Sequence, residues 1–345
     1  MTRTVVICFL GILWAPASTS GMQQTDVPAA VPTIILRAGI IHNVASSPVS
    51  STSNECDGRG YVFFELYEAS RMFSENAILR SSEDGKEVRS FSFPNDLGKR
   101  GDWHYSVDGA GGLYVTHSEL DNHVLVHLST TGEVSRTKLE LPAYFYVHSF
   151  AVLPDGRSMF VGSMPSSQTA SEYTESPVSI WLDPSGKIVQ KTSPGRPFSV
   201  SLTPFDGFVV PGMPGTFVEA GSSEIKIFGA RGDLIETLPV VKPTKDSFAS
   251  GLQFVDGTIA IVFQHPAGAG SFEPKGTSKA EGSSTPYVGP LEQIWLLENP
   301  ITGQNEAYYK MPKDFLGSAL CYLGHQGFLY LTMKDKRASL VEAAE

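Results

Sequence analysis

The chain has 345 residues, of which 41% are hydrophobic and only 18% are charged, with 33 glycines and 23 prolines. This composition supplies a sizeable core and favours many turns over long amphipathic helices. The formal net charge of −10 repels phosphate backbones, which argues against a nucleic-acid partner. The sequence contains no basic amphipathic stretch of the kind that binds a membrane surface.

Residues 1–20 have the layout of a secretory signal peptide: Arg3, an apolar run from Val5 to Trp14, and then small residues. A membrane anchor is the alternative, but the apolar run is short for a bilayer. We therefore expect export to the periplasm or the extracellular space, with no membrane span left after cleavage. Cleavage removes one basic residue and no acidic one, so the net charge falls from −10 to −11. Residues 21–30 are small and polar, and we expect a flexible leader before a single domain over residues 31–345.

Residues 106–142 predict four short strands in succession. The first strand ends at Ser106–Asp108, and the next three are expected at Leu113–His117, His123–Leu128 and Glu133–Leu141. Turns rich in Gly, Asp and Asn separate them, which is the usual pattern of hairpins. Four strands in about 40–50 residues is the size of one β-propeller blade.

Two patterns recur along the chain. A turn before a β-rich pair of strands occurs six times, at residues 57–64, 108–115, 154–161, 206–210, 255–263 and 324–331. A strand, glycine turn and second strand occur five times, with the glycines at Gly85, Gly132, Gly186, Gly232 and Gly303. The sequence therefore predicts an all-β, six-bladed β-propeller of four-stranded antiparallel blades. We expect the strand Ile34–Ile41 to complete the last blade and close the ring, because closure removes free sheet edges. The alternative is seven blades, with residues 22–55 as a degenerate blade.

Three segments carry a family resemblance. SEIKIFGARGDLIETLP (223–239) and NHVLVHLSTTGEV (122–134) resemble the second half of NHL-type repeats, and SVDGAGGLYV (106–115) resembles the first half. The chain thus resembles secreted bacterial six-bladed β-propellers of the NHL/TolB-like group over residues 31–345. That group includes binding domains, lactone hydrolases and other enzymes, so the resemblance implies a fold rather than a function. The Glu, Asn and Asp metal set of the lactonases is missing here, although the first blade has Glu55 and Asp57.

Two cysteines remain after cleavage, Cys56 in the first blade and Cys321 in the last. Ring closure would make these blades neighbours, and an exported protein meets oxidising conditions. Either a closing disulfide or two buried thiols fits the sequence.

Variation in length falls on one face of the predicted propeller. The turns on one face are short, whereas the second-to-third turns and the links between blades vary, up to the segment His265–Pro290. Variable loops on a rigid scaffold usually carry function. The segment is either a mobile lid or a tolerated insertion.

Aromatic and histidine residues gather where two links enter the innermost strands. These candidate ligand-binding residues are Trp103, His104, Tyr105, Tyr144, Tyr146 and His148. Aromatic rings beside imidazoles suit sugar or aromatic ligands through stacking and hydrogen bonding. The alternative is that the rings wedge between blades and the histidines are satisfied core groups.

A hairpin tip offers candidate metal ligands. His117 and His123 are expected to face each other across two strands, with Glu119 nearby. Imidazole and carboxylate ligands suit zinc or a similar ion. The alternative is a polar hairpin tip with Asp and Asn supplying turn geometry.

The sequence contains no nucleophile elbow, zinc-protease helix, dinucleotide fingerprint or phosphate loop. We therefore expect a monomeric binding scaffold whose variable-loop face recognises a carbohydrate, another small molecule, a peptide or a protein. The alternative is a metal-dependent or histidine-dependent hydrolase or lyase with its site at the mouth of the central channel. The sequence specifies no cofactor and leaves open whether the protein is an enzyme.

Overall fold

The computed structural model divides the chain into residues 1–30 and residues 31–345. It describes residues 33–35, 37–45, 54–57, 61–65, 77–82, 86–92, 103–119, 122–169, 172–193, 198–199, 207–221, 223–240, 242–243, 247–265, 292–299, 304–310, 320–324, 327–334 and 337–344. The predicted signal peptide, the predicted leader and residues 266–290 of the segment expected to be either a lid or a tolerated insertion lie outside these ranges. Among the described residues, no helix is long and apolar enough to cross a membrane.

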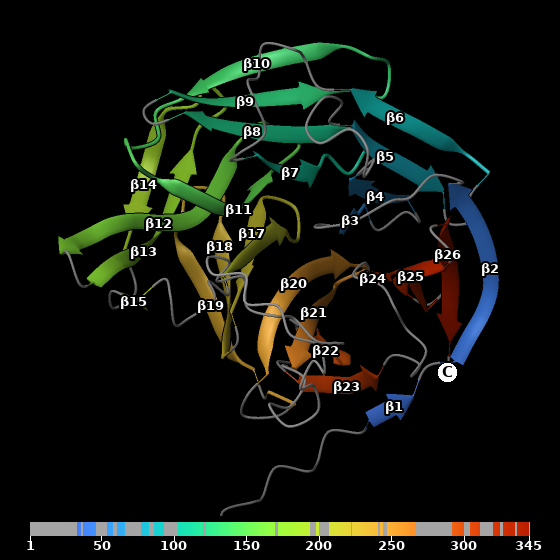
Figure 1. Cartoon of the computed structure of the whole chain (residues 1–345). Coiled ribbons are helices and arrows are strands. Elements are labelled where there is room, and N and C mark those ends of the chain that lie inside the picture. Colours follow the sequence, from blue (N-terminus) through green and yellow to red (C-terminus); the bar gives the residue numbers. More distant parts are fainter. Residues whose placement is uncertain are drawn as a thin grey trace, which may run out of the picture. The chain divides into compact units, whose positions relative to one another are not determined.

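The described residues contain no α-helix and form six sheets, numbered here 1 to 6 along the chain (Figure 1). All but one of the strand pairs are antiparallel, and consecutive strands of a sheet are neighbours except at the short β15 of sheet 3. Sheet 1 contains β3 (Asn54–Cys56), β4 (Tyr61–Glu65), β5 (Ala77–Ser82) and β6 (Val88–Ser92). Sheet 2 contains β7 (Trp103–Val107), β8 (Leu113–Glu119), β9 (Asn122–Leu128) and β10 (Val134–Leu139).

The middle sheets repeat this order. Sheet 3 contains β11 (Tyr146–Val152), β12 (Ser158–Thr169), β13 (Glu172–Leu182) and β14 (Ile188–Thr192), with the short β15 (Phe198–Ser199) beside β13. Sheet 4 contains β16 (Phe208–Pro211), β17 (Thr216–Ala220), β18 (Glu224–Gly229) and β19 (Leu234–Pro239).

The last two sheets each include a strand from the start of the chain. Sheet 5 contains β20 (Phe248–Val255), β21 (Thr258–His265), β22 (Glu292–Asn299), β23 (Gln304–Lys310) and β1 (Thr33–Ile35). Sheet 6 contains β24 (Leu320–Tyr322), β25 (Phe328–Lys334), β26 (Arg337–Ala344) and β2 (Arg37–Ala45). The single strand expected at Ile34–Ile41 is thus two strands. β1 lies parallel to β23, whereas β2 lies antiparallel to β26.

The predicted strands of residues 106–142 are confirmed as β7 to β10, with shifts at the ends. The turn glycines have the backbone geometry that the pattern requires. Gly132, Gly186 and Gly232 have φ between 84° and 92°, and each N–H donates to the carbonyl three residues earlier. This region of φ strains residues with a Cβ, which explains glycine at these turns. Gly85 and Gly303 lie outside the described residues.

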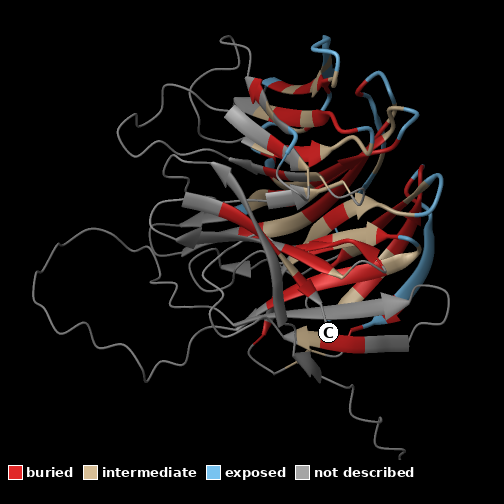
Figure 2. Ribbon diagram, turned by 90° about the vertical axis from the view of Figure 1, so that its right-hand side faces the viewer, coloured by how far each residue is buried: buried red, intermediate tan, exposed pale blue. Residues whose placement is uncertain are grey.

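The core consists of apolar layers between successive sheets. Alternate residues of one strand face different layers, as expected for a strand buried on both faces. Phe160 of β12 packs with Leu125 and Leu139 of sheet 2, whereas Val161 packs with Val209 and Phe217 of sheet 4. Similar layers lie between sheets 1 and 2, 4 and 5, and 5 and 6. Figure 2 shows buried residues in the strands and exposed ones mainly in turns and outer strands.

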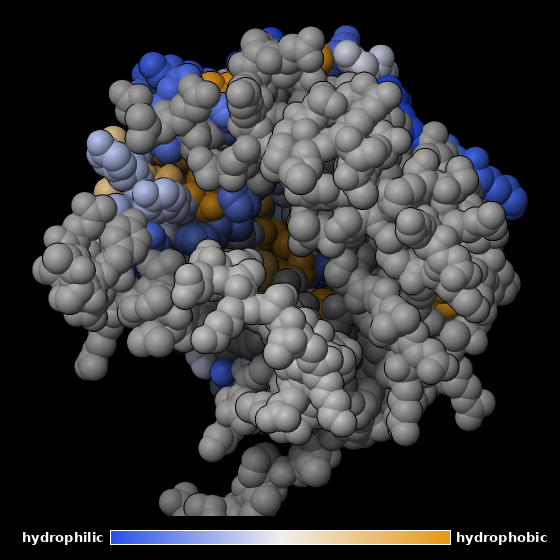
Figure 3. All heavy atoms as spheres, in the orientation of Figure 1, coloured by the Kyte–Doolittle hydropathy of each residue, from blue (hydrophilic) through white to orange (hydrophobic). Residues whose placement is uncertain are grey.

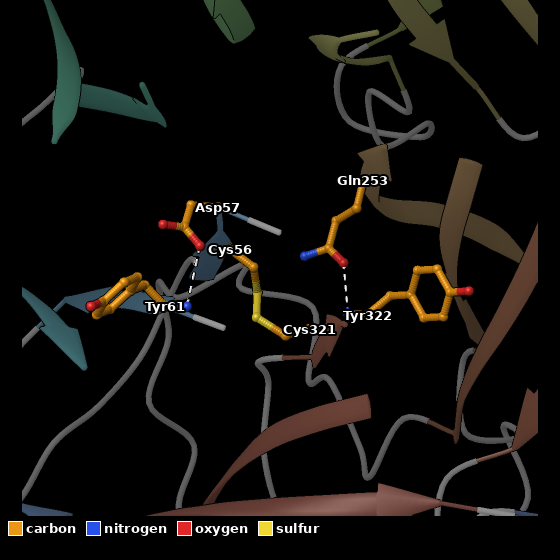
Figure 4. The surroundings of a disulfide bond; sticks show 6 residues. All are labelled: Cys56, Asp57, Tyr61, Gln253, Cys321 and Tyr322. Carbon is orange, nitrogen blue, oxygen red and sulfur yellow. Dashed lines mark hydrogen bonds between the residues drawn. A yellow bond between two sulfur atoms is a disulfide. The ribbon is translucent and has the colours of Figure 1, made fainter. Parts of the chain in front are cut away.

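A disulfide joins Cys56 of β3 to Cys321 of β24, with their Cα atoms 5.7 Å apart. The two cysteines are 265 residues apart in sequence, so the bond links sheet 1 to sheet 6 (Figure 4). Beside it, the N–H of Tyr322 donates to the Gln253 side chain of sheet 5 at 2.8 Å. Of the two alternatives for Cys56 and Cys321, a disulfide or two buried thiols, the structure shows the disulfide.

Candidate ligand site on sheet 3

A β-bulge on β11 places His148 out of regular register. β11 and β12 pair Val147 with Gly162 and then Ser149 with Val161, so His148 is the extra residue. A bulge bends a strand and re-aims the side chain that it inserts. Here it brings the His148 imidazole to Ser163 on β12, with 2.8 Å between Nε2 and Oγ.

The hydrogen bonds continue from Ser163 into the sheet. The Ser163 hydroxyl donates to the Glu175 carboxylate of β13, one strand further from β11. Ser163 is fully buried and Glu175 is 5% exposed. Because buried polar groups are costly without partners, this chain of three side chains holds the imidazole in a defined place.

Burial also determines the charge of His148. It lowers the pKa of the imidazole from 6.5 to about 4, because a charged ring loses its hydration inside the protein. At neutral pH the ring is therefore uncharged and offers one N–H donor and one acceptor nitrogen.

Two tyrosines lie exposed just before and at the start of β11. Tyr144 is 58% exposed and Tyr146 is 45% exposed. Tyr146 is the register partner of Ser163, so their side chains lie on the same face of the sheet. Tyr146 is therefore on the face of sheet 3 that carries Ser163, two residues before His148 on β11.

Tyr144 has a positive φ, which is unusual for a residue with a Cβ atom. Residues 142–145 form a turn closed by the Phe145 N–H on the Pro142 carbonyl at 3.2 Å, and Tyr144 at its third position has φ 61°. Glycine or asparagine usually occupies such a position, and a tyrosine there costs about 1–3 kcal/mol. Strain of this kind occurs often at binding sites, where the surrounding structure enforces it.

His123 supports this turn instead of meeting His117. β8 and β9 pair His117 with Val124 and Ser118 with His123. Because side chains alternate between faces, the two imidazoles point to opposite sides of sheet 2, which corrects the expected facing pair. His123 is 1% exposed, and its Nε2 lies 3.1 Å from the Pro142 carbonyl oxygen, which can only accept a hydrogen bond.

The metal site predicted at His117, Glu119 and His123 requires the two histidines to face each other, and they do not. Glu119 ends β8 opposite Asn122, and its side chain lies outside the described part. Among the described residues, no three His, Cys, Asp or Glu side chains gather to hold a metal ion.

The other predicted ligand-binding group lies on β7, whose residues contact β11. Tyr105 is 8% exposed and packs in the layer between sheets 1 and 2, which gives it a packing role. Alternation places His104, which is half-buried, on the opposite face of β7, toward sheet 3. Trp103 pairs with His117, and nothing is described of its side chain.

A second buried carboxylate lies between sheets 3 and 4. The Ser179 hydroxyl of β13 donates to Glu219 of β17 at 3.3 Å. Burial raises the pKa of Glu219, and the Lys226 charge and the Ser179 hydrogen bond oppose this effect. Ser163, Glu175 and Ser179 share the face of sheet 3 that packs on sheet 4, because they alternate in step with Val161 and Trp181.

A histidine outside the predicted set also has a carboxylate partner. His127 Nε2 lies 2.9 Å from Asp108, and Tyr114 stacks on the ring at 4.4 Å. The other oxygen of Asp108 accepts the N–H groups of Ala110 and Gly112 at 2.7 Å each. This cluster fastens the turn after β7 to β9, so its partners account for it as a structural element.

The chain His148–Ser163–Glu175 contains the residue types of a hydrolase triad in a different order. In such a triad, serine donates to histidine and is exposed to substrate. Here Ser163 is fully buried and donates to the carboxylate. The arrangement orients His148 and does not activate Ser163 as a nucleophile.

No family model and no curated protein matches the chain. Solved structures give weak similarities. An α-L-arabinanase from Penicillium chrysogenum, complexed with arabinobiose, is 12% identical, with a TM-score of 0.45 over 90% of this chain and 98% of that one. A gluconolactonase from Xanthomonas campestris is 12% identical, with a TM-score of 0.42 over 89% and 98%. The WD40 domain of Neurospora crassa Pan2 is 9% identical, with a TM-score of 0.42 over 87% and 90%.

Similarities at this level carry no argument about function. The described part of the chain is all-β, with four four-stranded antiparallel sheets and two five-stranded sheets, and its candidate site is defined by its own side chains. Figure 3 shows hydrophobic and hydrophilic residues side by side among the described atoms of one face.

Proposed function

We propose that this chain is an exported, monomeric six-bladed β-propeller of the NHL/TolB-like type that binds a neutral carbohydrate. The fold proposal is supported by six sheets of consecutive strands and by apolar layers between successive sheets. Closure of the ring is supported by β2 beside β26 and by the disulfide between sheets 1 and 6. The export proposal agrees with the disulfide, because disulfides persist in oxidising compartments.

The ligand site consists of Tyr144, Tyr146 and His148, supported by Ser163 and Glu175. The observation that carries it is a tyrosine at φ 61°, more than half exposed, in a turn that the buried His123 braces. Tyrosine presents an apolar ring face and a polar tip, which suits the alternating surfaces of a sugar. An uncharged imidazole adds hydrogen bonding without the cost of desolvating an ion.

A neutral sugar fits these groups better than a charged ligand does. The aromatic pair supplies contact area, and at pH 7 the histidine contributes no charge because its pKa is about 4. A hydrolase is the weaker candidate, because Ser163 is buried and donates to Glu175 rather than to His148.

The test is calorimetric titration of the mature domain with maltose, cellobiose, lactose and longer neutral oligosaccharides. A Tyr144→Gly variant removes the ring and keeps a residue that accepts positive φ. A Tyr146→Ala variant removes the second ring. Each is expected to weaken binding about 5–10-fold, the effect of losing one stacking contact.

Leu234→Ala on β19 is the matched control, because Leu234 is 56% exposed on another sheet and should leave binding unchanged. Equal loss in the control and the tyrosine variants would indicate a general destabilisation. Absence of binding to every sugar tested, or full binding by both tyrosine variants, would overturn the proposal.

A further inference from the structure

The donors and acceptors in the hydrogen bonds from His148 through Ser163 to Glu175 follow from counting protons. A carboxylate can only accept hydrogen bonds, and a serine hydroxyl has a single proton to donate. Ser163 donates that proton to Glu175, so it has only lone pairs left for His148. The 2.8 Å contact between Ser163 Oγ and His148 Nε2 then requires a proton on Nε2.

We infer that Glu175 is a positioning residue that acts through Ser163 to keep the proton of the neutral His148 ring on Nε2. The unprotonated nitrogen of the ring is then Nδ1, an acceptor, and any group that pairs with it must donate. The neighbouring nitrogen of a histidine is commonly fixed in this way by the hydrogen bond at the other one.

Geometry makes this control specific. Ser163 is fully buried and Glu175 is 5% exposed, so water does not compete readily for either side chain. Glu175 lies on β13, two strands from β11, and accepts the hydroxyl of Ser163 on the strand between them. Its influence on the imidazole therefore passes through the one hydroxyl between them.

The consequence for ligands rests on the proposed function, whereas the position of the proton does not. If the site holds a sugar, a ring whose proton is fixed on Nε2 can pair at Nδ1 with a sugar hydroxyl that donates, and not with one that must accept. Glu175 would then set hydrogen-bond polarity in the site without touching the ligand.

The experiment is nitrogen-15 NMR of the histidine rings in the ligand-free mature domain at pH 7. A His148→Gln variant identifies the His148 signals by their loss. The expected result is a single tautomer with the proton on Nε2. A proton on Nδ1 of His148 in the unmodified protein would overturn the inference.

Two variants test the role of Glu175. Glu175→Gln offers Ser163 either an oxygen or an N–H, so both directions become available and mixed tautomers are expected. Ser163→Ala cuts the connection and should also release the preference. Ser179→Ala is the matched control, since Ser179 is a buried serine on the same face that donates to Glu219 instead. A His148 tautomer that stays fixed on Nε2 in Glu175→Gln would contradict the inference.

Sugar titration separates this inference from the proposed function. With the tightest oligosaccharide from the panel, Glu175→Gln is expected to bind about 10-fold more weakly, as one hydrogen bond becomes mismatched. If Glu175→Gln changes the His148 tautomer but no form of the protein binds a sugar, the inference stands and the proposed function is wrong. If the proton stays on Nε2 in Glu175→Gln while sugars bind, the proposed function stands and the inference is wrong.

Discussion

The two faces of sheet 3 differ in what they bury. The face toward sheet 2 is apolar, with Phe150 and Phe160 stacked 5.3 Å apart among leucines and valines. The face toward sheet 4 is apolar near Met159 and Trp181 but carries Ser163, Glu175 and Ser179 further along. Burying a charged group such as a carboxylate costs free energy even when the group is paired. We infer that the first face stabilises the fold and that the second gives up stability for an oriented site.

The largest expected effect comes from creating a cavity in the apolar face of sheet 3, which packs on sheet 2. Phe160→Ala removes a fully buried ring and leaves a cavity, which should lower the free energy of unfolding by about 3–5 kcal/mol. Denaturant unfolding measures this change. Val134→Ala is the control, because Val134 is 47% exposed and should cost less than about 0.5 kcal/mol. Equal losses in the two variants would show that the layer between sheets 2 and 3 is not a tight core.

The face of sheet 3 toward sheet 4, which carries Ser163, Glu175 and Ser179, is called here the polar face. It predicts a pH dependence of stability that the apolar face toward sheet 2 lacks. The His148 pKa is lowered from 6.5 to about 4 in the folded protein, so the unfolded chain binds the proton more tightly. The resulting stability, about 3 kcal/mol, is present above pH 6.5 and is lost as the pH falls toward 4.

The measurement is the free energy of unfolding of the protein and of a His148→Gln variant from pH 7.5 to 4. The difference between them should shrink or reverse as the pH falls. A difference that stays constant over this range would mean that His148 is not buried as an uncharged ring.

The contrast between the faces also marks what could be predicted from sequence. The strands followed from glycine turns such as Gly132 and Gly186, whose positive φ leaves a local signal in the chain. His148 and the two tyrosines could be named as candidates because aromatics and histidines cluster within a few residues. Ser163 and Glu175 were not, because only the pairing of three strands and a bulge brings them to His148.

The pairing of His117 with His123 failed for a related reason. Their spacing in the sequence allowed a facing pair, but the β8–β9 register is offset by one residue, which turns the rings to opposite faces. Sequence patterns report turns and apolar alternation well. They do not report register, and register decides which polar side chains meet.

The smallest expected effect concerns Glu219, the carboxylate that sheet 4 presents to the polar face. Burial raises its pKa above the ordinary 4.5, so the folded protein holds the proton more tightly than the unfolded chain does. Its contribution to stability is therefore present below pH 4.5 and is lost as the pH rises through the folded pKa. Lys226, Glu224 and the Ser179 hydroxyl are the groups around it, and Lys226 also pairs with Glu224 at 2.6 Å.

Glu219→Gln keeps the shape and removes the charge. The variant should match the unmodified protein near pH 4 and gain stability relative to it as the pH rises to 8, measured by denaturant unfolding at each pH. Glu236→Gln on β19 is the control, because that side chain is exposed and should give a flat difference. If the Glu219→Gln difference is flat as well, the ionised carboxylate is satisfied where it lies, and the polar face of sheet 3 costs less than its burial implies.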